Sequence, residues 1–91
     1  MTTYGRRKAE KVLDRIGKEA SLQLKIATGL YAKHLAAGEV EVAYQWSAAH
    51  NGMLSMLKAL GMININELIL LIDYNVETGL ERAKEIKRNA A

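Results

Sequence analysis

The strongest constraint on this chain is an amphipathic periodicity that runs through residues 4–35. At 100° per residue its apolar side chains project to one side, and its basic ones fall within an arc of roughly 100° on the opposite side. The apolar side holds Leu13, Ile16, Ala20, Leu24, Ala27 and Tyr31. The basic arc includes a line of cations that we call the basic ridge: Arg7, Lys8, Lys11, Arg15, Lys18 and Lys25. The pattern predicts a helix with a core-facing front and this ridge along its back.

The net charge of +3 hides a segregation of charge along the 91 residues. Residues 1–33 sum to +5, residues 34–81 to −5 and the last ten residues to +3. Such asymmetry favours either an anionic partner or a self-complementary assembly.

Composition excludes several classes of protein. The chain has no cysteine, which excludes a disulfide framework and a thiolate metal site and favours a reducing cytoplasm. Because no run of about 18 apolar residues is present, we expect no membrane span. The basic N-terminus lacks the apolar stretch of a secretory signal.

Three helices in one domain (residues 1–91) are expected, and their ends fall at glycine and asparagine because the chain has no proline. The first helix begins near residue 3 and ends where Gly38 takes the left-handed conformation. The second runs to Gly61. Asn64 followed by Glu67 predicts a capping box that opens a third helix. The fold class is therefore all-α, a three-helix arrangement with a long first helix and a helical hairpin.

The predicted helices differ in length. The first helix is roughly 50 Å long at 1.5 Å per residue, whereas the other two are about 33–36 Å. A hairpin at Gly38 therefore leaves residues 4–15 overhanging, so that Val12 and Leu13 lack an intrachain partner. We favour a second subunit that covers the overhang, because the apolar arc keeps its phase across Gly17 and one interior glycine costs only about 1 kcal/mol. The alternative is a break at Gly17, which folds this segment back as a fourth helix.

The third helix has two distinct faces. The face predicted to lie in the core keeps near-heptad spacing through Ile65, Ile69, Ile72, Val76, Leu80, Ala83 and Ile86. The opposite face carries what we call the acidic ridge: Leu70, Tyr74, Glu77 and Glu81. We expect the acidic ridge to face solvent, where it is suited to dock the basic ridge of a neighbouring chain, with Leu22 meeting Leu70 or Tyr74, or to recognise a foreign basic surface.

The second helix has a back face with almost no charge. Its predicted core arc contains Ala43, Trp46, Met53, Leu57 and Leu60, and its back carries Ala48, Gly52, Ser55 and Ala59. Small side chains at helical spacing favour close approach of another helix. The alternative is that Asn51-Gly52, a strong turn dipeptide, breaks this helix in two.

The segment Leu30 to Trp46, "LYAKHLAAGEVEVAYQW", resembles the turn between the two helices of a tetratricopeptide-type repeat. The resemblance spans half a repeat and has no second copy in the chain, so it implies a tight hairpin and nothing about function.

No catalytic, cofactor or metal site is expected. His34 and His50 are offset by roughly 12 Å along a hairpin, too far to share a metal ion. The serines lie within helices, the glycines follow no phosphate-loop spacing, and the acidic residues form no acid–base pair.

These observations predict a non-enzymatic helical interaction module that self-associates and binds a partner macromolecule as an adaptor, regulator or inhibitor. The alternative function is a nucleic-acid-associated protein whose basic ridge follows phosphates. A small anionic ligand held in a basic cleft between subunits is a further option. The candidate protein contacts are Val12, Leu13, Leu22, Gly52, Leu70, Tyr74, Glu77 and Glu81.

Overall fold

Four α-helices make up the computed structural model, which describes residues 1–90. They are α1 (Thr3–Ile16), α2 (Lys18–Ala36), α3 (Val40–Ala59) and α4 (Ile65–Ala90). No strand occurs within the described residues. The predicted all-α class is therefore confirmed.

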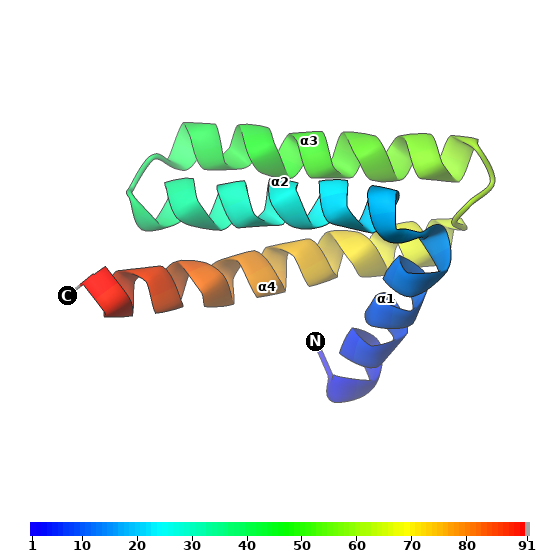
Figure 1. Cartoon of the computed structure of the whole chain (residues 1–91), viewed down its shortest axis with the longest axis horizontal. Coiled ribbons are helices and arrows are strands. Elements are labelled where there is room, and N and C mark those ends of the chain that lie inside the picture. Colours follow the sequence, from blue (N-terminus) through cyan, green and yellow to red (C-terminus); the bar gives the residue numbers. More distant parts are fainter. Residues whose placement is uncertain (91) are drawn as a thin grey trace.

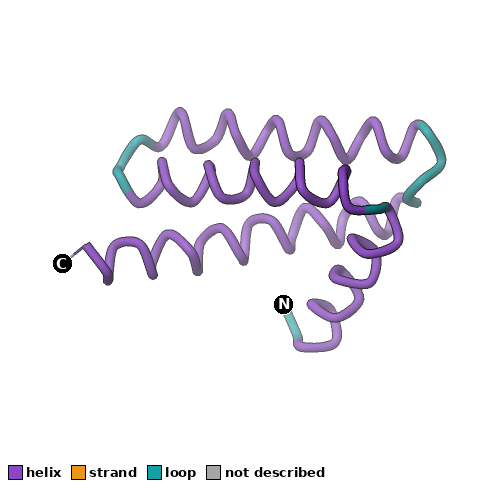
Figure 2. Tube along the Cα trace, viewed as in Figure 1, coloured by secondary structure: helices purple, strands orange, loops and turns teal. Residues whose placement is uncertain are grey.

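The helix α2 packs against both α3, which runs antiparallel to it, and α4, which runs parallel to it (Figure 1). The chain reverses direction sharply after α1, which lies across one end of α4 and contacts α2 and α4. The connections between helices are short (Figure 2). One end of the molecule therefore has four helices around its core, and the other end has three.

The predicted continuous first helix is wrong, because the chain breaks at Gly17. This residue has φ 100° and ψ 162°, a backbone conformation that essentially only glycine adopts. The break lets α1 fold back and bury Val12, Leu13 and Ile16, the side chains that a straight helix leaves uncovered. Burying three such side chains is worth about 1.5–3 kcal/mol each, more than one glycine and a few interrupted helical hydrogen bonds cost. Ser21 Oγ donates to the carbonyl of Leu13, which satisfies one of the free carbonyls at the end of α1.

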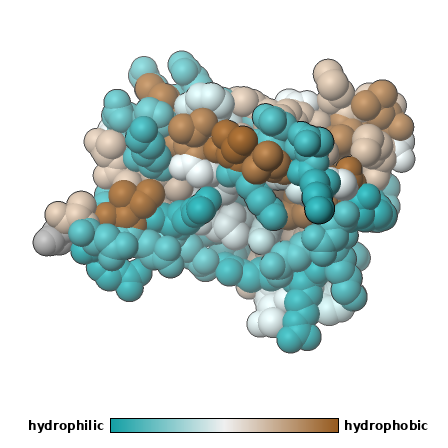
Figure 3. Space-filling model, viewed as in Figure 1, coloured by the Kyte–Doolittle hydropathy of each residue, from teal (hydrophilic) through white to brown (hydrophobic). Residues whose placement is uncertain are grey.

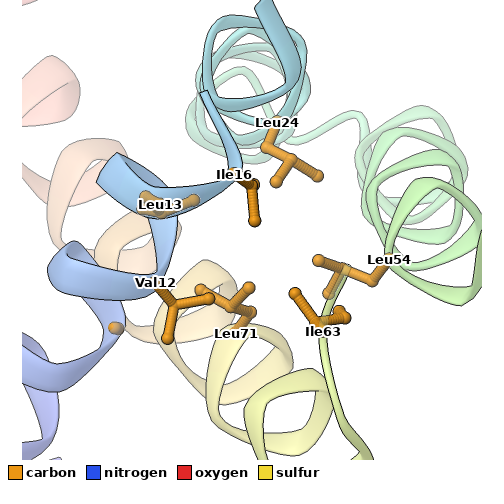
Figure 4. Close-up of a cluster of buried hydrophobic side chains, with 8 residues drawn as sticks. Val12, Leu13, Ile16, Leu24, Leu54, Ile63 and Leu71 are labelled. Atoms are coloured by element: carbon orange, nitrogen blue, oxygen red, sulfur yellow. The ribbon is translucent and has the colours of Figure 1, made fainter. Parts of the chain in front are cut away.

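The core forms where all four helices meet. Side chains from α1, α2, α3 and α4 point toward one another there, and Ile63 of the α3–α4 connection joins them (Figure 4). The buried members are Ala9, Val12, Leu13, Ile16, Leu24, Leu54, Ile63 and Leu71. Since α1 fills this core from within the same chain, the overhang that led us to predict a second subunit does not exist.

The predicted helix ends are confirmed. Gly38 and Gly61 have φ of 79° and 75° and follow α2 and α3, and each helix closes with the paired hydrogen bonds of a Schellman motif. At the start of α4, Glu67 N donates to Asn64 Oδ1 at 2.8 Å and Asn64 N donates to Glu67 Oε1 at 3.0 Å. This is the predicted capping box.

The helix α4 is rotated relative to the predicted orientation. Its buried residues are Leu71, Asn75, Gly79 and Ala83, and of these only Ala83 belongs to the predicted core face. Two of the four are a polar residue and a glycine, which a search for apolar periodicity passes over. As a consequence, the near-heptad face points largely to solvent.

The helix α3 is continuous through Asn51 and Gly52, so the alternative break does not occur. Its core is centred on Ala43, His50 and Leu54, which are buried. The predicted core residue Leu60 is 68% exposed, because α3 has ended before it and the chain turns away at Gly61.

Candidate functional site

An exposed line of aliphatic side chains runs along α4. We call it the α4 seam; it consists of Ile65, Ile69, Ile72, Val76 and Leu80. These positions fall within an arc of roughly 80° at 100° per residue. Ile65 and Ile69 are 51% and 52% exposed and Val76 and Leu80 are 40% and 42% exposed, while Ile72 is half-buried. Burying an aliphatic side chain stabilises a protein by about 1.5–3 kcal/mol. Covering the α4 seam with another apolar surface would therefore lower the free energy.

The other exposed aliphatic side chains are more scattered. On α2, Leu22 and Ile26 are 51% and 45% exposed. Figure 3 shows hydrophobic patches in the upper half of the view, over α2 and α3, and a mostly hydrophilic surface below, over α4 and α1. By the exposure of individual residues, the α4 seam is the longest single line of exposed aliphatic side chains on one helix within residues 1–90.

The back of α3 is also exposed and nearly uncharged. Between Glu41 and Lys58 this helix carries no formal charge. Ala48, Gly52, Ser55 and Ala59 are all exposed, and a Cβ added at Gly52 meets nothing within 4 Å. No helix of the same chain approaches Gly52, so any close helix partner there belongs to another molecule.

The acidic ridge of α4 is occupied by the chain's own α1. Arg6 Nη2 donates to Glu77 Oε1 at 2.8 Å and also to Glu81 Oε1, and the N-terminal ammonium group lies 2.7 Å from Glu77 Oε2. The ammonium group and then Arg6 lower the pKa of Glu77, and the two carboxylates raise the pKa of Arg6. Leu70 and Tyr74 pack against the core beside them. The acidic ridge therefore holds α1 in place.

A second ion pair fixes the other end of α1. Arg15 Nη1 donates to Glu67 Oε2 at 2.7 Å, and Arg15 Nη2 donates to Glu67 Oε1 at 2.8 Å and to the Met62 carbonyl at 3.0 Å. The Arg15 guanidinium and the Asn64 backbone N–H lower the pKa of Glu67 to about 2. Glu67 thus joins the α4 cap to α1.

The basic ridge is divided between two helices. Arg7, Lys8 and Lys11 are exposed on α1, Arg15 is engaged by Glu67, and Lys18 and Lys25 are exposed on α2 beyond the break at Gly17. The structure therefore does not align these six cations along one helix.

The candidate protein contacts separate into three groups. Val12 and Leu13 are buried in the core, Leu22 and Gly52 are exposed, and the four members of the acidic ridge contact α1 or the core. Sequence reasoning missed Arg6, although a signal was present. Arg6 lies seven residues before Leu13 and so shares its apolar side, where a charge requires a counter-ion.

The histidines and acidic residues form no metal site in residues 1–90. His34 Nδ1 lies 3.0 Å from Glu39 Oε1. His50 is buried, and burial lowers its pKa, so the ring is neutral at pH 7. None of the described helices is both long and apolar enough to cross a bilayer. A cytoplasmic location stays a prediction.

Comparison with protein-family models, with curated proteins and with solved structures finds no match. What this chain does is therefore inferred from its own residues.

Proposed function

We propose that this chain is a non-enzymatic helical interaction module and that its α4 seam pairs with the α4 seam of a second copy. The observation that supports this most is the near-heptad line of aliphatic residues that the folded chain leaves exposed. Such spacing is typical of helices that pack along their length against another helix.

The total exposed surface of the chain is larger than expected for a compact monomer, which supports an interface with a partner. The chain exposes 5960 Å², whereas a compact monomer of 10.1 kDa exposes about 5,300 Å². The excess of roughly 700 Å² is close to the area of about 800 Å² that each partner buries in a standard interface. The α4 seam extends over about four turns of α4, which is long enough to contribute the centre of an interface of this area.

The helix dipoles favour a second copy in antiparallel orientation, because the partly positive N-terminus of each α4 then lies toward the partly negative C-terminus of the other. When two seams overlap fully in this orientation, Ile65 of one copy lies opposite Leu80 of the other, and Ile69 lies opposite Val76. The exposed Asp73 side chains of the two copies then approach each other near the centre of the pair, where salt screens their repulsion.

A pair of matched substitutions tests this proposal. Ile69 on the seam and Leu22 on α2 are 52% and 51% exposed, so an aspartate at either position costs the single chain about the same. We expect light scattering to give twice the 10.1 kDa chain mass for the wild type and for Leu22→Asp, and the chain mass for Ile69→Asp. A monomeric wild type, or dissociation by Leu22→Asp alone, contradicts the proposal.

The alternative function, association with nucleic acid, is supported only by Arg7, Lys8 and Lys11, which are exposed on α1 and form no ion pair within residues 1–90. Binding through phosphates weakens steeply as salt is added. If this function holds, replacing these three residues with glutamine abolishes a salt-dependent affinity for polyanions, whereas Ile69→Asp leaves it unchanged.

A further inference from the structure

A cavity of ≈ 400 Å³ lies between α2 and α4, beside the point where α1 crosses them. Its volume is within the range of about 300–1,000 Å³ typical of ligand sites. Its lining comes from all four helices, with Leu13 from α1, Leu24 and Lys25 from α2, His50 from α3, and Leu71 and Arg82 from α4. The cavity exists because α1 covers only one end of the groove between α2 and α4.

The lining changes from apolar to charged with increasing exposure. The most deeply buried members include Leu13, Leu24 and Leu71. Asn75 is also buried, but its amide is already engaged: Oδ1 accepts from Thr28 Oγ1 at 2.6 Å, and Nδ2 donates to Ser47 Oγ at 3.2 Å. The inner part of the cavity is therefore mostly apolar, and its other buried polar residue is His50, whose Nδ1 lies 3.2 Å from Asn51 Oδ1.

The charged residues at the rim favour an anion. Glu81 is bound by Arg6, which leaves Lys25, Arg82 and Glu85 as the rim charges without an ion pair in the described part of the chain. Arg82 reaches from α4 toward α2, since its Nη1 lies 3.4 Å from the position of a Cβ on Gly29. Gly29 is one turn after Lys25 on the same face of α2. Lys25 of α2 and Arg82 of α4 therefore line the same opening, about one helical turn apart along α2.

We propose that this cavity binds a small amphipathic anion, with the apolar part of the ligand against the leucines and its carboxylate or similar acidic group between Lys25 and Arg82. The cavity lies on the side of α4 opposite the α4 seam. Residues two positions apart in a helix point about 160° apart at 100° per residue, as do Thr78 on the cavity and Leu80 on the seam. Ligand binding is thus independent of the proposed self-association.

The proposal is tested with octanoate and 1-octanol, which share an apolar chain and differ in charge. Both compete against the fluorescent probe 8-anilinonaphthalene-1-sulfonate, and backbone amide shifts in NMR spectra locate the octanoate. We expect octanoate to bind about tenfold more tightly than octanol, as suits a charge-assisted contact. We also expect the largest shifts around Lys25, Thr28 and Arg82.

Matched variants separate the cavity from the rest of the surface. Lys25→Gln with Arg82→Gln should reduce octanoate affinity to that of octanol, whereas Lys33→Gln with Lys84→Gln removes two exposed charges from the same helices outside the cavity and should change neither affinity. Thr78→Leu should weaken both ligands by filling space, and it is tolerated because Thr78 Oγ1 bonds only backbone carbonyls of its own helix.

Three outcomes overturn the proposal. They are equal loss of octanoate affinity in the two charge variants, unchanged affinity in Thr78→Leu, and amide shifts centred on the α4 seam or on the second cavity around Lys18 and Leu22. Ile69→Asp, which tests self-association, should leave octanoate binding as it is.

Discussion

The ring of Tyr31 lies directly against the backbone of Gly79, so that a Cβ on Gly79 would be 2.4 Å from Tyr31 Cδ2. Both residues are buried, and the contact holds α2 against α4. We expect Gly79→Ala to lower the free energy of unfolding, because overpacking costs about 1–3 kcal/mol while alanine returns at most about 1 kcal/mol of helix propensity. Urea unfolding of the variant measures this change.

Gly52→Ala is the matched control with the opposite sign. Gly52 is also within a helix, but it is exposed and an added Cβ has open space. The same substitution should therefore raise the free energy of unfolding by about 0.5–1 kcal/mol. Equal effects at the two glycines would show that α2 and α4 do not approach as closely as described.

Gly17→Ala should destabilise the chain by about 1–3 kcal/mol, because its φ of 100° and ψ of 162° are strained for any residue with a side chain. If the chain instead relieves this strain by continuing the helix through residue 17, α1 leaves α4 and Arg6 loses Glu77. Both routes lower the urea midpoint. An unchanged or higher midpoint would mean that the break does not depend on glycine.

Acid should weaken the contact between Glu67 and Arg15. The pKa of Glu67 is about 2 in the folded chain and 4.5 ordinarily, so its stabilising effect is complete above pH 4.5 and is lost as the pH falls toward about 2. Glu67→Gln keeps an acceptor for the capping box but no charge. We expect urea titrations at neutral and acidic pH to show a smaller loss of stability in Glu67→Gln than in the wild type. An identical loss in both proteins would remove Glu67 from this role.

The helix ends could be predicted because their signals are local. Gly38 and Gly61 follow their helices directly, and Asn64 and Glu67 are three residues apart in the capping box. The break at Gly17 could not be predicted from periodicity, since the apolar phase is the same with and without it. What decides the break is a tertiary contact, the docking of α1 on α4.

The side of α4 that faces the core could not be predicted from the apolar periodicity of the sequence either. Its near-heptad face was correctly identified as one line of apolar residues but was assigned to the core. Asn75 and Gly79 instead occupy the centre of the buried side, for reasons that depend on Thr28, Ser47 and Tyr31 of other helices. The residues of the α4 seam were thus known from the sequence, whereas their exposure required the structure.

Pairing of two α4 seams in antiparallel orientation is tested most directly by disulfide cross-linking, since the chain has no cysteine of its own. One variant carries Ile65→Cys and the other carries Leu80→Cys, two exposed positions at opposite ends of the seam. In an antiparallel pair, residue 65 of one copy lies opposite residue 80 of the other, so only a mixed dimer brings the two thiols together. A parallel pair would instead bring together the thiols of two identical variants.

Mild oxidation followed by electrophoresis without reductant provides the measurement. We predict a cross-linked species at twice the 10.1 kDa chain mass in the equimolar mixture and almost none in either variant alone. Cross-linking of each variant with itself, or no cross-linking in the mixture, would contradict antiparallel pairing of the two seams.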